Sequence, residues 1–283
     1  MPERVSSPTP ALALSAVPFT LRALSTVTRL LPPVRGSGRL ALSLASRLHR
    51  GQGMRVLPIW AGVRMMVDPS DCLGRLLAFV PHLYDRWERQ AIAAILRPGD
   101  VFVDVGSNIG AYALWAARCL GSSGCVLAIE PEDENYQSLV QNIRLNGLED
   151  RITTVHCGVN DQRQVLPMHR NVTGNRGGHN FMGIGMEGPA IECFPLDEIL
   201  ESVDICRPRM MKLDIEGFER RVLERYFSRV RGNALPEYLL VEIDGGPAPE
   251  PERRLLRRSL SARGYRAVRE GLNTLYVKDV AES

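Results

Sequence analysis

Residues 101–110 read Val-Phe-Val-Asp-Val-Gly-Ser-Asn-Ile-Gly, and this stretch decides the fold. Its apolar half predicts a buried strand over Val101–Val105, and residues 111–120 predict a helix. Gly106 and Gly110 mark a turn between the strand and the helix. In α/β proteins, a glycine-rich turn of this kind binds a nucleotide-like cofactor at the carboxyl ends of the strands. The stretch therefore predicts a cofactor site.

A carboxylate at the end of this strand narrows the choice of cofactor. The glycines are spaced G-x-x-x-G, so the dinucleotide fingerprint G-x-G-x-x-G is absent. Asp104 would lie near the cofactor, where an anionic pyrophosphate is unfavourable and a cationic group is favourable. S-adenosylmethionine carries both an ammonium and a sulfonium. The turn therefore predicts S-adenosylmethionine, with an NAD-type oxidoreductase on a related sheet as the alternative.

Strands and helices alternate along the rest of the chain. Further strands are predicted over Val126–Ile129, Ile152–His156, Met210–Leu213 and Tyr238–Ile243, with a final hairpin of Tyr265–Val268 and Thr274–Val277. Helices are predicted over Asp85–Leu96, Asp133–Leu145, Glu219–Phe227 and Pro251–Ala262. This alternation predicts an α/β fold: a mostly parallel seven-stranded sheet with helices on both faces and an antiparallel C-terminal hairpin at its edge.

Polar residues that follow the strands are candidates for cofactor binding. Glu130 ends the second strand of the sheet, about 20 residues after the turn, where an acid accepts hydrogen bonds from ribose hydroxyls. Ser107 and Asn108 lie in the turn and either contact the carboxylate of the cofactor or stabilise the turn itself. Asp161 follows the third strand and is either a partner of the adenine amino group or an ordinary turn aspartate.

Three segments together resemble the FkbM family of S-adenosylmethionine-dependent methyltransferases. They are Asp-Val-Gly-Ser-Asn-Ile-Gly at 104–110, Ile-Glu-Pro at 129–131 with Asn135, Leu139, Asn142 and Asn146 after it, and Met-Lys-Leu-Asp-Ile-Glu-Gly-Phe-Glu at 211–219. The resemblance covers residues 85–280, roughly. It implies a class I, Rossmann-like fold and methyl transfer to a hydroxyl of a sugar or another small natural product. It also implies cofactor binding by Asp104, Gly106 and Glu130.

Methyl transfer to a hydroxyl needs a group that takes up the hydroxyl proton. Asp214 and Glu216 follow the fourth strand, beside the expected cofactor, and are the first candidates; Lys212 is expected to pair with one of them. Helix capping is the alternative role for both acids. His179, in the glycine-rich stretch 171–188, is a further candidate base because histidine titrates near neutral pH.

A divalent metal is a possible but not favoured addition to this site. Glu242 and Asp244 end the fifth strand and share a face by the two-residue period of a strand, so with Asp214 they are candidate ligands for Mg²⁺. Metal-dependent O-methyltransferases are expected to have an acid after one strand and an acid next to an amide after the other. This sequence does not match that pattern. Glu242 is alternatively a residue that orients the substrate. A methyltransferase-like module that binds a partner without activity also remains an alternative.

The first 50 residues differ from the rest of the chain, since no acidic residue occurs between Arg4 and Val67. Two amphipathic helices are predicted, near Thr20–Leu31 and Gly38–His49. We expect residues 1–50 to be an extension that is disordered, lies on a membrane surface or is a transit peptide. Residues 51–283 are expected to form the methyltransferase domain.

Composition excludes several other classes of protein. The net charge of +3 is too small to indicate nucleic-acid binding. No apolar run after residue 50 is long enough to span a membrane, and the six cysteines lack a C-x-x-C pair. These features predict a cytoplasmic protein with reduced, buried thiols. A small-molecule acceptor is what the family resemblance implies. The sequence does not predict which molecule is the acceptor.

Overall fold

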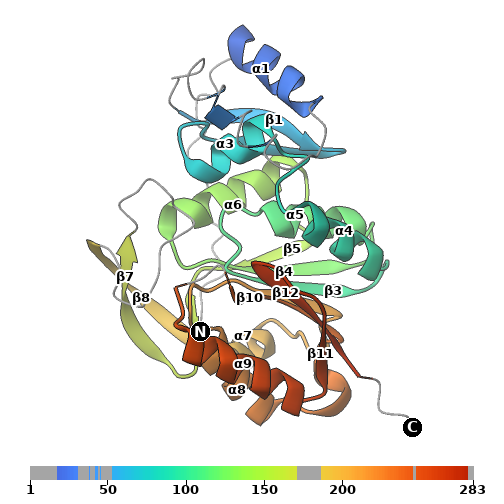
Figure 1. Ribbon diagram of the computed structural model, residues 1–283, viewed down its shortest axis with the longest axis vertical. Helices are drawn as coiled ribbons and strands as arrows, with labels where there is room; N and C mark the ends of the chain where they lie inside the picture. The colour runs from blue at the N-terminus through green and yellow to red at the C-terminus, as the bar shows by residue number, and fades with distance from the viewer. Residues whose placement is uncertain are drawn as a thin grey trace.

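A seven-stranded sheet forms the centre of the protein in the computed structural model (Figure 1), which describes residues 18–30, 38, 42, 43, 45, 53–170, 186–244 and 247–279. The strands are β3 (Val101–Val105), β4 (Cys125–Ile129), β5 (Ile152–Val155), β9 (Met210–Leu213), β10 (Tyr238–Glu242), β11 (Tyr265–Arg269) and β12 (Asn273–Lys278). Their order is β11-β12-β10-β9-β3-β4-β5. The predicted fold class is confirmed.

The antiparallel C-terminal hairpin lies at the edge of the sheet, as predicted. Strand β12 folds back between β10 and β11 and is antiparallel to both of them. The remaining pairs of neighbours in the sheet are parallel. The outermost strand, β11, therefore runs in the same direction as the parallel strands, and β12 is the antiparallel strand next to it.

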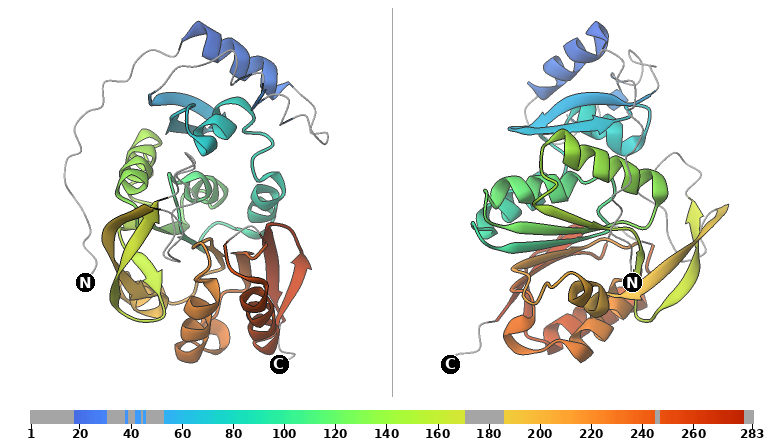
Figure 2. Two further views of the ribbon diagram at one scale, coloured as in Figure 1. Left: turned by 60° about the vertical axis from the view of Figure 1, so that its left-hand side comes forward. Right: turned by 180° about the vertical axis from the view of Figure 1, so that it is seen from behind.

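Two layers of helices cover the two faces of the sheet (Figure 2). One layer contains α4 (Arg86–Ile95), α5 (Ala111–Cys119) and α6 (Asp133–Leu145), and the other contains α7 (Leu196–Ser202), α8 (Glu219–Arg229) and α9 (Glu250–Ala262). A hydrophobic core lies on each face of the sheet, and each strand contributes side chains to both cores because its side chains alternate between the faces. Phe102 packs in the core under α5, whereas Val103 and Val105 pack in the core under α8.

A small N-terminal layer covers α6 and α5 from outside (Figure 1). It comprises α1 (Phe19–Arg29), the antiparallel hairpin of β1 (Arg55–Trp60) and β2 (Val63–Val67), and α3 (Cys72–Phe79). Asn142 of α6 and Asn146, which follows the helix, attach this layer: their amide oxygens accept hydrogen bonds from the backbone of Met66 (2.6 Å) and Arg64 (3.0 Å). The first predicted amphipathic helix corresponds to α1, and most of Gly38–His49 lies outside the described residues.

A separate three-stranded sheet follows β5. It contains β6 (Gly158–Asn160), β7 (Gln164–Arg170) and β8 (Met186–Pro195), in the order β6-β8-β7. All six cysteines are described and free, but Cys72, Cys125 and Cys206 are exposed, so burial of the thiols holds only in part. No helix within the described ranges combines the length and the apolar character needed to cross a bilayer.

Candidate active site

A pocket of about 290 Å³ lies at the carboxyl ends of β3, β4, β9 and β10. Its wall includes the turn after β3, Glu130 after β4, Asp214 after β9, and Glu242 at the end of β10. On the outer side, α3 adds apolar side chains from the N-terminal layer. The site therefore lies where α/β sheets bind their ligands.

The two glycines of the turn are both required by close packing. Gly106 has a φ of +78°, and a Cβ there would lie 2.0 Å from the backbone oxygen of Asp214. Gly110 has a φ of +91°, and a Cβ there would lie 2.7 Å from the side chain of Leu139 on α6. Glycine thus lets the strand-to-helix turn approach both the end of β9 and helix α6.

Glu130 is the polar group that connects the turn to β4. It is 5% exposed, and its two carboxylate oxygens accept hydrogen bonds from the backbone N–H groups of Asn108 (2.7 Å) and Glu132 (3.1 Å). Burial raises the pKa of the Glu130 carboxyl to about 7. A carboxylate oxygen can accept more than one hydrogen bond, so Glu130 retains acceptor capacity toward the pocket for a pair of ligand hydroxyls.

Asp104 and Lys212 form a buried ion pair beneath the pocket. They are register partners on β3 and β9, on the sheet face that α5 covers. The Lys212 Nζ lies 3.6 Å from Asp104 and 3.1 Å from Asp214. Burial raises the pKa of Asp104 to about 6 although Lys212 opposes this shift. Burial alone would lower the pKa of Lys212, but Asp214 and Asp104 raise it overall. The lysine therefore stays charged between two acids.

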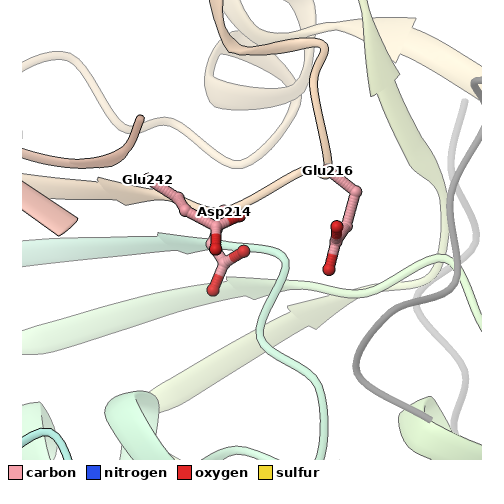
Figure 3. A group of neighbouring side chains, drawn as sticks. All are labelled: Asp214, Glu216 and Glu242. Atoms are coloured by element: carbon pink, nitrogen blue, oxygen red, sulfur yellow. The ribbon is translucent and has the colours of Figure 1, made fainter. Parts of the chain in front are cut away.

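Three carboxylates converge at the other end of the pocket. Oxygens of Asp214, Glu216 and Glu242 lie within 4.8 Å of one another, and Figure 3 shows the three side chains reaching into one space. Burial, to which the negative charge of Asp214 adds, raises the pKa of Glu216 to about 8 and that of Glu242 to about 9. Both glutamates therefore hold a proton at neutral pH when no ligand is bound. The cluster can accept a proton or bind a cation.

Glu219 fixes the turn that carries Glu216. It is 3% exposed and accepts hydrogen bonds from the backbone N–H groups of Ile215 (2.9 Å) and Gly217 (3.0 Å). Its position at the first residue of α8 satisfies donors that precede the helix. Glu216 itself has a φ of 55°, which is uncommon for a residue with a side chain. The turn thus holds the Glu216 carboxylate beside Asp214.

The sequence of this domain matches a family model that agrees with the geometry. A model described as the methyltransferase FkbM domain matches residues 104–267, more than half of the chain. The chain belongs to the FkbM family of S-adenosylmethionine-dependent methyltransferases. The match includes the glycine turn, Glu130 and the three converging carboxylates.

Two relatives and one solved structure show what the chain is similar to. The hexuronic acid methyltransferase AglP of Haloferax volcanii is 27% identical over 176 residues, which are 60% of this chain and 68% of the relative. A tRNA (guanine(37)-N(1))-methyltransferase of Danio rerio is 38% identical over 68 residues, 24% of this chain and 13% of the relative. A solved FkbM methyltransferase from Methylobacillus flagellatus has 21% identity and a TM-score of 0.44, with 72% of this chain and 54% of that chain covered. The chain thus spans little more than half of that FkbM protein.

The predicted cofactor residues of this FkbM domain fall into two groups. Gly106, Ser107, Asn108 and Glu130 line the pocket. Asp104, Gly110 and Asp161 do not. Asp104 is fully buried against Lys212, so its direct contact with a cofactor stays a prediction. Gly110 shapes the turn. Asp161 instead adds negative charge near Arg225 on α8.

The predicted catalytic and metal residues also separate. Asp214 and Glu216 meet as expected, and Glu242 joins them. The expected convergence of Asp244 on this FkbM site is wrong, because its carboxylate accepts hydrogen bonds from Arg257 (2.8 and 2.9 Å). The physical reason is that β10 ends at Glu242, so the two-residue alternation does not extend to Asp244. His179 lies outside the described residues.

The sequence did not predict α3, which supplies the apolar wall of the FkbM pocket. Cys72, Leu73 and Leu76 line the pocket from this helix. Gly74 in its first turn obscures the helical pattern, and a Cβ there would lie 1.9 Å from the backbone oxygen of Asp68. The available signal was Asp71, whose carboxylate caps the helix by accepting from the Gly74 N–H (3.3 Å). Tyr84 and Tyr112 were also missed as wall residues.

The raised pKa of Glu216 predicts the pH dependence of this FkbM enzyme. A group accepts a proton only when it is deprotonated, so we expect kcat/KM to rise with pH and to level off above the Glu216 pKa of about 8. The measurement is a pH–rate profile between pH 6 and 9.5 for the wild type and for Glu216→Gln. We expect the ascending limb to flatten in the variant. An unchanged limb in Glu216→Gln would assign the titrating group elsewhere.

Proposed function

We propose that the protein transfers the methyl group of S-adenosylmethionine to a hydroxyl of a small, sugar-type molecule. The observation that carries this proposal is the position of three converging carboxylates beside a glycine turn closed by Glu130. The first feature accepts a proton from a hydroxyl, and the second fits the ribose of the cofactor. A single pocket includes both.

The residues of the turn fit S-adenosylmethionine by their shape and by their chemistry. Gly106 packs so closely against the backbone of Asp214 that a Cβ would force the turn away from the end of β9, and both residues line the pocket. Glu130 accepts hydrogen bonds from the ribose hydroxyls. Ser107 and Asn108 line the pocket beside it, and their N–H groups hold the turn by donating to Ile129 and Glu130. Bound S-adenosylmethionine supplies an electrophilic methyl group. Asp104 acts on this site through Lys212, which holds the end of β9 in position.

Asp214 and Glu216 act together on the acceptor. Asp214 accepts the hydrogen bond of the acceptor hydroxyl and holds its oxygen in line with the methyl group; positioning of this kind supplies up to ~7–11 kcal/mol of the barrier reduction. Glu216 takes up the hydroxyl proton, because Asp214 helps to raise its pKa to about 8, near the working pH. Glu242 orients a second hydroxyl of the acceptor. His179 remains an alternative base from the sequence alone.

The acceptor is proposed to be a neutral part of a sugar. Among the described residues on the pocket wall, Lys212 is the cationic side chain, and it is already paired with Asp214 and Asp104. A sugar hydroxyl can donate to the acids of this wall, whereas an anionic group would be repelled by them. The hexuronic acid methyltransferase relative supports a sugar as the class of acceptor. A hexuronic acid would bind with its carboxylate outside the pocket.

The test of this function has two measurements on the same protein. Calorimetric titration with S-adenosylmethionine is expected to give saturable heat, and titration with NAD is expected to give none. Incubation with methyl-labelled cofactor and a panel of hexoses, hexuronic acids and their glycosides is expected to give an O-methylated product. Cofactor binding without transfer to any sugar would favour a silent binding module, and binding of NAD alone would favour an oxidoreductase.

We expect the reaction to be independent of a divalent metal. Lys212 already places a positive charge 3.1 Å from Asp214, and the raised pKa values of Glu216 and Glu242 let protons relieve the remaining repulsion. Treatment with EDTA followed by gel filtration is therefore expected to leave turnover unchanged. Loss of activity that Mg²⁺ or Mn²⁺ restores would instead assign Asp214, Glu216 and Glu242 as metal ligands.

The division of the chain and its location complete the proposal. Residues 51–283 form the methyltransferase domain, and residues 1–50 are an extension attached to it. We propose a cytoplasmic enzyme that contacts a membrane surface through this extension, without nucleic acid as a partner.

A further inference from the structure

Helix α1 is fixed to the domain by one of its faces. Leu21 is fully buried, and the Ser25 hydroxyl donates a hydrogen bond to the backbone oxygen of Ala78 at 2.7 Å. The Thr28 hydroxyl donates to the backbone oxygen of Phe79. Both acceptors lie in the last turn of α3, where helical carbonyls lack partners of their own. The contacts set which face of α1 points away from the protein.

The opposite face of α1 is apolar and exposed. Phe19, Val27 and Leu30 are 83%, 60% and 80% exposed. Together with exposed Ala23, they lie within one sector of the helix at 100° per residue. We call these four residues the outer stripe. Exposed apolar side chains that line up in this way mark a contact site rather than an ordinary protein surface.

The positive charge of the arginines around the outer stripe indicates an anionic partner. Arg22 is exposed on α1 beside the stripe. Arg29 lies about two helical turns further along, on the same side of the stripe. Eight arginines and no acid occur between Arg4 and Val67. An apolar helical face flanked by arginines, in an acid-free segment, complements a bilayer with anionic headgroups.

The place of α1 in the molecule makes such a contact possible. It forms one end of the longest dimension of the protein, beyond the β1–β2 hairpin (Figures 1 and 2). A groove between α1 and β1, lined by Arg22, Arg29 and Leu30 among others, opens beside the stripe. A phosphate group in this groove would find two guanidinium groups next to an apolar surface.

We propose that α1 is an in-plane anchor whose outer stripe inserts into the headgroup region of an anionic bilayer. Arg22 and Arg29 bind lipid phosphates at the rim of the contact. This inference goes beyond the proposed methyl transfer and does not depend on it. The contact is reversible, because a single short amphipathic helix buries little apolar area and depends on charge for part of its affinity.

The test is co-sedimentation of the full chain with vesicles of phosphatidylcholine alone or with a third of phosphatidylglycerol. We expect binding to the anionic vesicles, weakened by added salt. The double variant Phe19→Ser/Leu30→Ser is expected to lower the binding constant at least about tenfold. The matched control is Val165→Ser/Leu272→Ser, which changes two apolar side chains that are 60% and 67% exposed elsewhere. All four substitutions are at exposed positions, so thermal unfolding should be unchanged.

Other occupants of the outer stripe give different results. A second copy of the chain would appear as a dimer in sedimentation equilibrium without vesicles, and Phe19→Ser/Leu30→Ser would dissociate it. A segment of the chain itself would leave the wild type monomeric and unable to sediment with either vesicle. Either outcome, or equal binding by the stripe and control variants, would overturn the proposal. Methyl transfer to a soluble acceptor is expected to be unchanged in the stripe variant. A failure of the membrane-binding proposal can therefore be distinguished from a failure of the methyl-transfer proposal.

Discussion

Asp214→Asn is expected to lower kcat by about 10²-fold or more, because the acceptor oxygen loses the group that positions it, while the Kd for S-adenosylmethionine changes little. The substitution keeps the size of the side chain but removes the charge that holds the acceptor hydroxyl. It also removes a negative charge that raises the pKa of Glu216, so Glu216 becomes a weaker base. The measurements are kcat, KM for both substrates and the Kd for the cofactor.

A second readout separates this chemical role from a structural one. Because Asp214 raises the pKa of Glu216, the ascending limb of the pH–rate profile should move to lower pH in Asp214→Asn. Asp244→Asn is the matched control: Asp244 lies near the same end of the sheet but is bound to Arg257 outside the pocket. Wild-type turnover in Asp214→Asn, or an equal loss in Asp244→Asn, would reject the assigned role.

Glu130→Gln is expected to weaken the binding of S-adenosylmethionine by at least about 100-fold. Hydrogen bonds to charged groups contribute ~1.5–3 kcal/mol each, and two bonds to the ribose hydroxyls correspond to about two or more factors of ten in Kd. The glutamine also replaces one of the acceptors for the N–H groups of Asn108 and Glu132 with an amide donor, which loosens the turn. Calorimetry gives the Kd directly.

The control for this second variant is Asp161→Asn. Asp161 was a candidate cofactor residue from the sequence, but its side chain does not line the pocket. We therefore expect its substitution to leave the Kd within about threefold of the wild type. A large loss in Asp161→Asn would restore its predicted contact with adenine, and unchanged affinity in Glu130→Gln would remove Glu130 from the cofactor site. At saturating cofactor, the kcat of Glu130→Gln should be closer to the wild-type value than its Kd for the cofactor is.

The sequence was sufficient for the sheet because each strand is a short apolar run with a clear boundary. Strand β3 (Val101–Val105) and helix α6 (Asp133–Leu145) match their predicted limits. The elements that were missed lack such a pattern: α3 contains Gly74, and β6 has three residues. The order of β11 and β12 at the edge depends on how their hairpin folds back onto the sheet, which local sequence does not encode.

The site was predictable for residues that directly follow a strand and less so for residues farther from the strand end. Glu130 and Asp214 follow strands whose limits the sequence gives, and both lie on the pocket wall. Asp244 lies two residues beyond β10, where alternation no longer determines direction. For Asp104, the two-residue period already places the side chain on the same face as Phe102, under α5. Its burial beside Lys212 follows from that face and from the register of β9, which requires the structure.

The amide side chains of Asn142 and Asn146 have a consequence for how this protein behaves in a crowded solution. An unpaired strand edge recruits strands from other molecules and is a common start of aggregation. On β2, Asn146 donates to the backbone oxygen of Arg64 at 2.6 Å and accepts from its N–H group, and Asn142 accepts from the N–H of Met66. The outer edge of β2 is thus already occupied by side chains. Two asparagines therefore occupy the β2 edge of the hairpin, where a strand of another molecule would otherwise pair.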